Sequence, residues 1–204
     1  MERSFEFARL MKDGKPVIDG NGKELLAYPE AQLPEYQTLY SAGADFFCAE
    51  EVTVPSIWYG VFHVFSEWLG YVVKNMGKAS EGKTFSEDTK EKLNKSLSPT
   101  LVHTGIKSYM GEDEVLELYN RSSNPKKLGL ILANSVGVVD SDYYNNEGND
   151  GEIMFAYFNF KPWSVTLKVG DRIGQGVFKK FLRPDVGLRV KNAVRREGFG
   201  STNN

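Results

Sequence analysis

Three short segments of this chain carry side chains suited to binding and hydrolysing a phosphate chain. Asn-Arg-Ser-Ser at 120–123 offers a cation and hydroxyl groups to phosphate oxygens. Gly-Val-Val-Asp-Ser-Asp-Tyr at 137–143 offers a carboxylate at a predicted hairpin, beside an aromatic ring. Arg-Arg-Glu-Gly-Phe-Gly-Ser-Thr at 195–202 offers further cations, a ring between glycines, and two hydroxyl groups. Each motif alone could match by chance, but their joint presence predicts nucleoside triphosphate chemistry.

The composition restricts the classes to which the protein can belong. A chain of 204 residues suffices for one domain with an elaboration, and its net charge of -2 is unlike that of a general nucleic-acid binder. One cysteine, Cys48, cannot form an internal disulfide, and two histidines leave little for a zinc site. The N-terminus lacks the apolar core of a signal peptide. We therefore expect a cytoplasmic protein without nucleic acid or membrane as a partner.

Most of the chain is predicted to form short strands separated by turns. Five segments are rich in β-branched and aromatic residues, and Gly, Asn, Asp and Pro lie between them. A further segment, 15–22, has the composition of a hairpin. Many short strands at close spacing favour an all-β sandwich or barrel. The five predicted strands are 52–54, 114–119, 129–133, 152–158 and 172–178.

One segment, 56–76, departs from this pattern. Its apolar residues recur at helical spacing around most of the circumference, leaving a narrow polar stripe that includes His63 and Glu67. Such a helix must be buried, and we expect it to cover the chain's own sheet or a sister subunit. A membrane span is disfavoured because His63 and Glu67 fall near its middle.

A polar stretch from Lys78 to Lys95 follows the predicted helix. Ser86, with Glu87 and Asp88 after it, is predicted to cap a brief helix ending near Lys95. We interpret 56–98 as one helical insertion within a single β domain that spans 1–204.

The motifs, taken together, closely resemble those of the trimeric dUTPase family, and five of them appear in the family's order between residues 41 and 202. The resemblance implies a jelly-roll-like β-barrel, a homotrimer with shared active sites, and magnesium-dependent cleavage of dUTP to dUMP and pyrophosphate. Details at 120–127 are similar to the branch found in Gram-positive bacteria and their phages, so the expected location is bacterial or infected-host cytoplasm. The motifs are Ser-Ala-Gly-Ala-Asp-Phe at 41–46, Arg-Ser-Ser at 121–123, the segment 134–143, Gly-Asp-Arg-Ile-Gly-Gln at 170–175, and Gly-Phe-Gly-Ser-Thr at 198–202, with Thr-Gly-Ile at 104–106 in addition.

The resemblance assigns catalysis to Asp140, which orients and deprotonates the water that attacks the α-phosphorus. From the residues alone, a carboxylate beside a turn is more often a turn former. Tyr143 matches the tyrosine that packs against deoxyribose and leaves no room for a 2′-hydroxyl. Asn134 matches a residue that helps the hairpin backbone bind uracil. Asp142 is left as a hairpin residue.

Further residues match the family's phosphate and metal sites. Arg121 and Ser122 match the phosphate-binding motif, with Ser123 beside them. Gln175 matches a glutamine that contacts the phosphates. Asp45 matches an aspartate that meets Mg²⁺ through water, while the phosphates hold the ion.

The C-terminal tail, 195–204, is expected to be mobile and to close over the active site. Its Phe199 matches the ring that stacks on uracil. Arg195, Ser201 and Thr202 match the residues that hold the γ-phosphate. Flanking glycines allow such a segment to fold over a ligand.

Several features depart from the family pattern. Glu197 replaces the first of two glycines that usually precede the tail phenylalanine. Gly174 and Gly176 stand where the family tends to have apolar side chains. The residues 144–150 replace a short turn and predict a longer hairpin. The largest departure is the insertion 56–98, which could alter the trimer geometry.

Two rival functions remain. One is a dCTP deaminase-like enzyme of the same fold, which shares the Arg-Ser-Ser phrase and needs a glutamate base, for which Glu152 is the candidate. The other is a nucleotide-gated regulatory protein that binds a protein partner through 56–98.

We also interpret Asp171 and Arg172 as structural pairing at the start of a strand.

Overall fold

The computed structural model describes residues 2–76 and 84–185, and its architecture is dominated by antiparallel strands. A four-stranded sheet has the order β10-β8-β13-β4, and a three-stranded sheet has the order β6-β11-β9. Three pairs, β1-β7, β12-β5 and β2-β3, accompany them. The bounds are β1 Ser4–Phe7, β2 Met11–Lys12, β3 Lys15–Pro16, β4 Ala44–Phe47, β5 Val52–Val54, β6 Thr100–His103, β7 Ile106–Tyr109, β8 Glu114–Asn120, β9 Leu130–Leu132, β10 Gly137–Asp140, β11 Met154–Asn159, β12 Val165–Leu167 and β13 Arg172–Lys180.

The all-β prediction is confirmed, and all five predicted strands are present with ends shifted by at most two residues. The hairpin predicted at 15–22 is also present, because Asp19 donates its backbone N–H to the carbonyl of Lys23 at 2.8 Å and Ile18 pairs with Glu24. The strands β1, β2, β4, β6, β7 and β12 had not been predicted. In β4 all four residues are buried, including Asp45, so the strand shows no alternation of polar and apolar residues.

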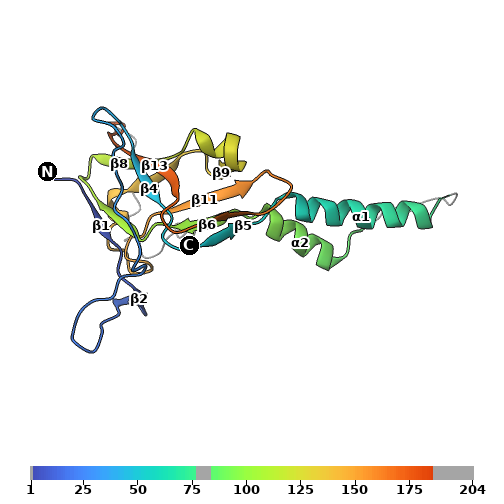
Figure 1. Cartoon of the computed structure of the whole chain (residues 1–204), viewed down its shortest axis with the longest axis horizontal. Helices are drawn as coiled ribbons and strands as arrows, with labels where there is room; N and C mark the ends of the chain where they lie inside the picture. Colours follow the sequence, from blue (N-terminus) through green and yellow to red (C-terminus); the bar gives the residue numbers. More distant parts are fainter. Residues whose placement is uncertain (1, 77–83, 186–204) are drawn as a thin grey trace.

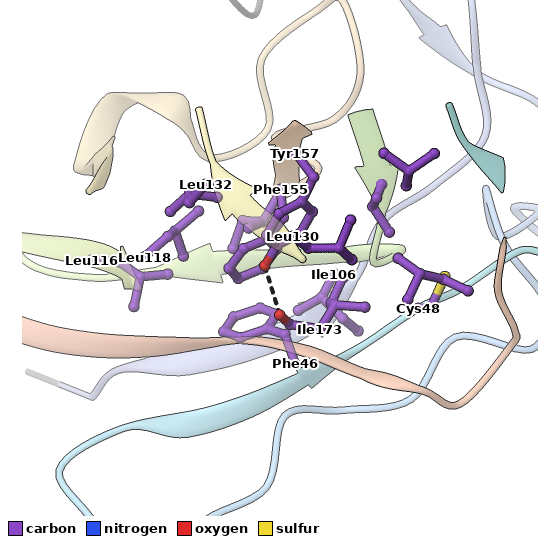
Figure 2. Close-up of a cluster of buried hydrophobic side chains, with 14 of the residues drawn as sticks. Phe46, Cys48, Ile106, Leu116, Leu118, Leu130, Leu132, Phe155, Tyr157 and Ile173 are labelled. Atoms are coloured by element: carbon purple, nitrogen blue, oxygen red, sulfur yellow. Dashed lines mark hydrogen bonds between the residues drawn. The ribbon is translucent and has the colours of Figure 1, made fainter. Parts of the chain in front are cut away.

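The core lies between the sheets and consists mainly of aliphatic side chains, with the rings of Phe46, Phe155 and Tyr157 among them (Figure 2). Tyr157 donates its hydroxyl hydrogen to the carbonyl of Ile173 at 2.6 Å, and burial raises the pKa of that hydroxyl. A Cβ atom at Gly174 would lie 2.0 Å from Cε1 of Phe155, and one at Gly176 would lie 2.6 Å from Cε2 of Phe46. The glycines therefore stand at these positions because the two phenylalanine rings already fill the space.

The insertion forms two helices, α1 Trp58–Lys74 and α2 Glu87–Leu97, which extend away from the sheets (Figure 1). The predicted cap of the second helix is confirmed, since Ser86 Oγ accepts a hydrogen bond from the N–H of Thr89 at 3.2 Å. One face of α1 packs against α2. There the carboxylate of Glu67 accepts hydrogen bonds from the hydroxyls of Ser86 and Thr89.

The opposite face of α1 is open to solvent. The prediction that this helix covers the chain's own sheet is therefore wrong, and its apolar residues lie on a projecting arm instead (Figure 1). Within residues 2–76 and 84–185, no helix combines the length and the apolarity needed to cross a bilayer. The exposed apolar residues of the arm are Trp58, Tyr59, Val61, Phe62, Phe65, Trp68, Leu69, Val73 and Met76.

Candidate active site

One group of predicted site residues surrounds Asp45 on β4. The strands β4 and β13 pair so that Asp45 lies opposite Gln175, whose Nε2 donates to Asp45 Oδ1 at 2.9 Å. Arg172 donates from Nη1 to Oδ2 at 3.2 Å, and Arg121 Nε lies 3.8 Å from Oδ1. Asp45 is only 2% exposed. The result is one buried carboxylate beside two guanidinium groups, a cluster with net positive charge that suits an anionic ligand.

Arg121 is held at the end of β8 by a turn rather than left on a free loop. Its Nη1 donates to the carbonyl of Arg172 at 3.0 Å, and Ser122 beside it is exposed. Ser123 precedes a single π-helical turn, η1 Asn124–Leu128. Asn124 is buried and donates from Nδ2 to the carbonyl of Ile173 at 2.6 Å. Asn124 therefore fixes the turn that presents Arg121.

The sequence analysis missed the roles of Asn124 and Arg172. Arg172 was interpreted as a structural partner of Asp171, but its Nη1 binds Asp45 and also Gln37 Oε1 at 2.9 Å. The carboxylate of Asp171 accepts from the N–H of Lys168 at 2.8 Å. Asp171 belongs to the turn before β13, whereas Arg172 is the first residue of that strand.

A second group of predicted site residues lies along β10 and its two ends. Asp140 is the last residue of β10 and is exposed, and the 3-10 turn η2 Ser141–Tyr143 follows it. Tyr143 is 7% exposed, and its hydroxyl donates to the carbonyl of Glu152 at 3.1 Å. Asn134 lies exposed in the turn between β9 and β10, where its carbonyl accepts from Val136 N–H at 2.6 Å.

The two groups lie toward opposite ends of β8. Asp140 pairs with Val115, whereas Gln175 pairs with Tyr119, and Arg121 lies beyond the end of the strand. Four residues separate Val115 from Tyr119, which at about 3.3 Å per residue is about 13 Å along the strand. The chain therefore does not bring Asp140 next to the positive cluster around Asp45.

The remaining predicted residues lie outside the described part of the chain. They are Arg195, Phe199, Ser201 and Thr202, together with the tail 195–204 to which they belong.

No metal cage is built by the protein in the part of the chain that the structure describes, where no three His, Cys, Asp or Glu side chains gather to hold an ion. Asp45 still fits an indirect role. A carboxylate can accept about four hydrogen bonds, and Arg172 and Gln175 supply one each. The remaining lone pairs are suited to water molecules in the hydration shell of a hard cation such as Mg²⁺.

Glu152, the candidate base of a deaminase, has a structural position. It is 5% exposed, and its Oε1 accepts from the N–H of Gly105 at 3.0 Å. Both of its oxygens lie 3.1 Å from His103 Nδ1. The hydrogen bond with Glu152 raises the pKa of His103 above its usual value.

Comparison with known proteins identifies relatives of this architecture. The family model described as dUTPase matches residues 89–203. A deoxyuridine 5′-triphosphate nucleotidohydrolase of Lactococcus lactis is 49% identical over 102 residues, covering 50% of this chain and 68% of that protein. The crystal structure of dUTPase from Streptococcus mutans shares 35% identity with a TM-score of 0.54, over 76% of this chain and 89% of that one.

A more distant structure supports the fold alone. A mutant dUTPase from phage phi11 of S. aureus, described with a structural Mg(II) ion, is 16% identical with a TM-score of 0.50. The match covers 82% of this chain and 95% of that one. The jelly-roll-like all-β class predicted from the sequence agrees with these neighbours.

Proposed function

The chain belongs to the dUTPase family, and from this premise we propose that it hydrolyses dUTP to dUMP and pyrophosphate. The reaction keeps uracil out of DNA and supplies dUMP. The observation that carries the proposal is the placement of Asp140, an exposed carboxylate at the end of β10, three residues before the enclosed ring of Tyr143.

Asp140 acts as the general base. Its carboxylate takes a proton from a water molecule while the oxygen of that water attacks the α-phosphorus. The new oxygen–phosphorus bond forms as the bond to the oxygen that bridges to the β-phosphate breaks, and pyrophosphate leaves. Exposure gives this base access to water, and pairing of Asp140 with Val115 of β8 fixes its backbone.

Tyr143 and Asn134 select the nucleoside. The Tyr143 ring packs against deoxyribose, where a 2′-hydroxyl would clash with it. Asn134 and the backbone of its turn bind the edge of uracil, because a site built to pair with one donor–acceptor pattern leaves polar groups unpaired with any other. Phe199 stacks on the same base.

The positive cluster binds the phosphates. Arg121 and Gln175 already lie beside Asp45, and the hydroxyls of Ser122 and Ser123 follow on the same turn. Guanidinium and hydroxyl groups are good donors to phosphate oxygens. From the tail 195–204, the residues that close over the γ-phosphate are Arg195, Ser201 and Thr202.

The proposed cofactor is Mg²⁺. Bound to the triphosphate, Mg²⁺ neutralises charge and polarises the α-phosphate. Asp45 would hold the ion through water molecules of its hydration shell.

The proposed assembly is a homotrimer with active sites shared between subunits. Support comes from the separation of Asp140 from the cluster around Asp45. Within one chain these two groups lie toward opposite ends of β8, so one chain does not bring them together. A second copy that places its Asp45 cluster beside Asp140 supplies the missing half. In this arrangement residues 1–204 form one β domain, with 56–98 inserted in it.

The decisive experiment compares hydrolysis of dUTP, dCTP, dTTP and UTP in the presence of Mg²⁺. We expect only dUTP to be cleaved well. Asp140→Asn should bind dUTP but lose roughly 10²- to 10⁴-fold in kcat, the usual contribution of a general base. Full activity of that variant would refute the assignment of Asp140.

Release of ammonia when the protein is incubated with dCTP would instead support the rival function, a dCTP deaminase. The surroundings of Glu152 argue against that reaction, because the N–H of Gly105 and Nδ1 of His103 already occupy its carboxylate. We place the protein in the cytoplasm of a bacterium or an infected host cell. Its single cysteine, Cys48, is a free and buried thiol, as expected in a reducing compartment.

The insertion suggests a second role in protein association. Along α1, exposed and half-buried apolar residues follow a 4-3-4-3-4 spacing, which is the pattern of a helix that packs on another helix. We propose that α1 of a second copy covers this seam within the homotrimer, because copies related by a threefold axis bring identical positions together. The seam consists of Trp58, Phe62, Phe65, Leu69, Val72 and Met76.

Thiol cross-linking tests this seam. Leu69→Cys should form cross-linked dimers in the full-length protein, whereas Ser66→Cys, exposed on the same helix outside the seam, should not. Cys48 does not interfere, because burial raises the pKa of its thiol to about 11. Equal cross-linking of the two variants would overturn the proposal and favour a different protein as the partner of this face, as in a nucleotide-gated regulator.

A further inference from the structure

The long connection that follows Tyr143 holds this tyrosine at both ends. At the hydroxyl end, Asn149 Nδ2 donates to Tyr143 Oη at 2.9 Å and to the carbonyl of Glu152 at 3.2 Å. At the backbone end, Asn146 Nδ2 donates to the carbonyl of Tyr143 at 3.1 Å. The ring between these two points therefore has little freedom to tip.

The connection has an ordered structure of its own. Asn146 is 4% exposed, and its Oδ1 accepts from the N–H groups of Gly148 at 2.9 Å and Asn149 at 3.0 Å. Its Nδ2 also donates to Asn149 Oδ1 at 2.8 Å. Gly151 closes the connection with φ +82, where a Cβ atom would lie 2.6 Å from the Tyr143 carbonyl oxygen.

A buried ionic network anchors the connection to the rest of the chain. Asp150 is fully buried and accepts from the backbone N–H of Arg9 at 2.8 Å, from Arg9 Nε at 3.0 Å and from Lys107 Nζ at 2.9 Å. Burial alone would raise the pKa of Asp150, but the hydrogen bonds from Arg9 and Lys107 outweigh it and lower the pKa. The side chains that hold Tyr143 thus rest on β7 and on the N-terminal segment.

From this network we propose that Asn149 is a positioning residue for sugar discrimination. Exclusion of a 2′-hydroxyl by a ring is steric, so it fails when the ring can move aside. Asn149 prevents this movement by holding the Tyr143 hydroxyl, and it touches neither the substrate nor the reacting atoms. This inference rests on the proposed hydrolysis of dUTP.

The test measures kcat/KM for UTP and for dUTP. Asn149→Ala should raise the UTP-to-dUTP ratio roughly three- to tenfold, as expected for loss of one neutral hydrogen bond. Tyr143→Phe removes this bond together with the one that the Tyr143 hydroxyl donates to the Glu152 carbonyl, so it should raise the ratio at least as much. The double variant should raise the ratio no further than Tyr143→Phe alone, because that variant has already lost the hydroxyl that Asn149 holds. Glu147→Ala, exposed in the same connection, is the matched control and should leave the ratio unchanged.

The outcomes separate this inference from the function on which it rests. A wild-type protein that does not cleave dUTP refutes the proposed function itself. A wild-type protein that does cleave dUTP, with an unchanged ratio in a folded Asn149→Ala variant, overturns the role of Asn149 alone. Should Asn149→Ala not fold, Tyr143→Phe decides by the same ratio, since it leaves the connection intact.

Discussion

Two carboxylates of the candidate site, Asp45 and Asp140, have surroundings that suit them to different tasks. Asp45 is buried between Arg172, Gln175 and Arg121, which stabilise its charge and give its immediate surroundings a net positive charge. Asp140 ends a strand and is exposed, so water reaches it. Environment rather than residue type therefore separates the two carboxylates, since one is buried among donors and the other is open to water.

The geometry of Arg121 predicts that lysine cannot replace it. Its Nη1 bonds the carbonyl of Arg172 while its Nε faces Asp45, and only a planar guanidinium spans both partners. Arg121→Lys should raise KM for dUTP by about tenfold or more. Steady-state kinetics would check this, with Lys126→Arg on the adjacent turn as control. An unchanged KM would mean that Arg121 does not meet the phosphates.

The pair formed by His103 and Glu152 predicts a pH dependence of stability. Because Glu152 raises the pKa of His103 in the folded protein, stabilisation is full below the unfolded pKa of about 6.5 and is lost as pH rises through the higher folded-state pKa. The free energy of unfolding in urea should therefore fall as pH rises above about 6.5. In His103→Gln this decline should be smaller. A decline of equal size in both proteins would contradict the assignment.

At the scale of elements, local patterns predicted five of the thirteen described strands and both helices of the insertion. Period-two runs gave the five strands, helical spacing gave α1, and the Ser86 cap gave α2. Patterns failed where burial depends on distant partners. Asp45 is polar yet buried because β13 brings Gln175 and Arg172 to it. The apolar face of α1 is exposed in this chain. Periodicity predicts that such a face needs a partner, but it does not identify the partner.

The contact between α1 and α2 depends on Gly60. A Cβ atom there would lie 2.1 Å from Ser96 Oγ and 2.6 Å from Leu93 Cα, and backbone atoms cannot yield easily. Gly60→Ala should therefore push α2 away and cost about 1–3 kcal/mol of local stability. Faster hydrogen exchange in α2, with dUTP hydrolysis retained, is the expected result.

Gly70 provides the matched control, because no atom lies within 4 Å of a Cβ atom built there. Gly70→Ala in α1 should slow hydrogen exchange of the α1 amides slightly, since alanine is the better helix former by about 1 kcal/mol. Slower exchange in Gly60→Ala as well would show that packing does not require the glycine.

At the scale of the whole molecule, the motifs name candidate site residues but not how one chain distributes them. Order along the sequence does not reveal that Asp140 and Gln175 occupy different ends of the sheet, because strand pairing and register decide that. The same limit applies to Gly174 and Gly176. They looked like departures from the family pattern, and only the positions of Phe155 and Phe46 explain them.

The packing of Phe155 on Gly174 joins the two main sheets, because β11 and β13 belong to different ones. Gly174→Ala should destabilise the protein by about 1–3 kcal/mol through overpacking. Phe155→Ala should cost about 3–5 kcal/mol through the cavity it leaves. In the double variant the new methyl group enters that cavity, so the combined loss should be smaller than the sum of the two. Urea unfolding of the four proteins measures this difference, and strictly additive losses would show that the ring and the glycine do not form one contact between the sheets.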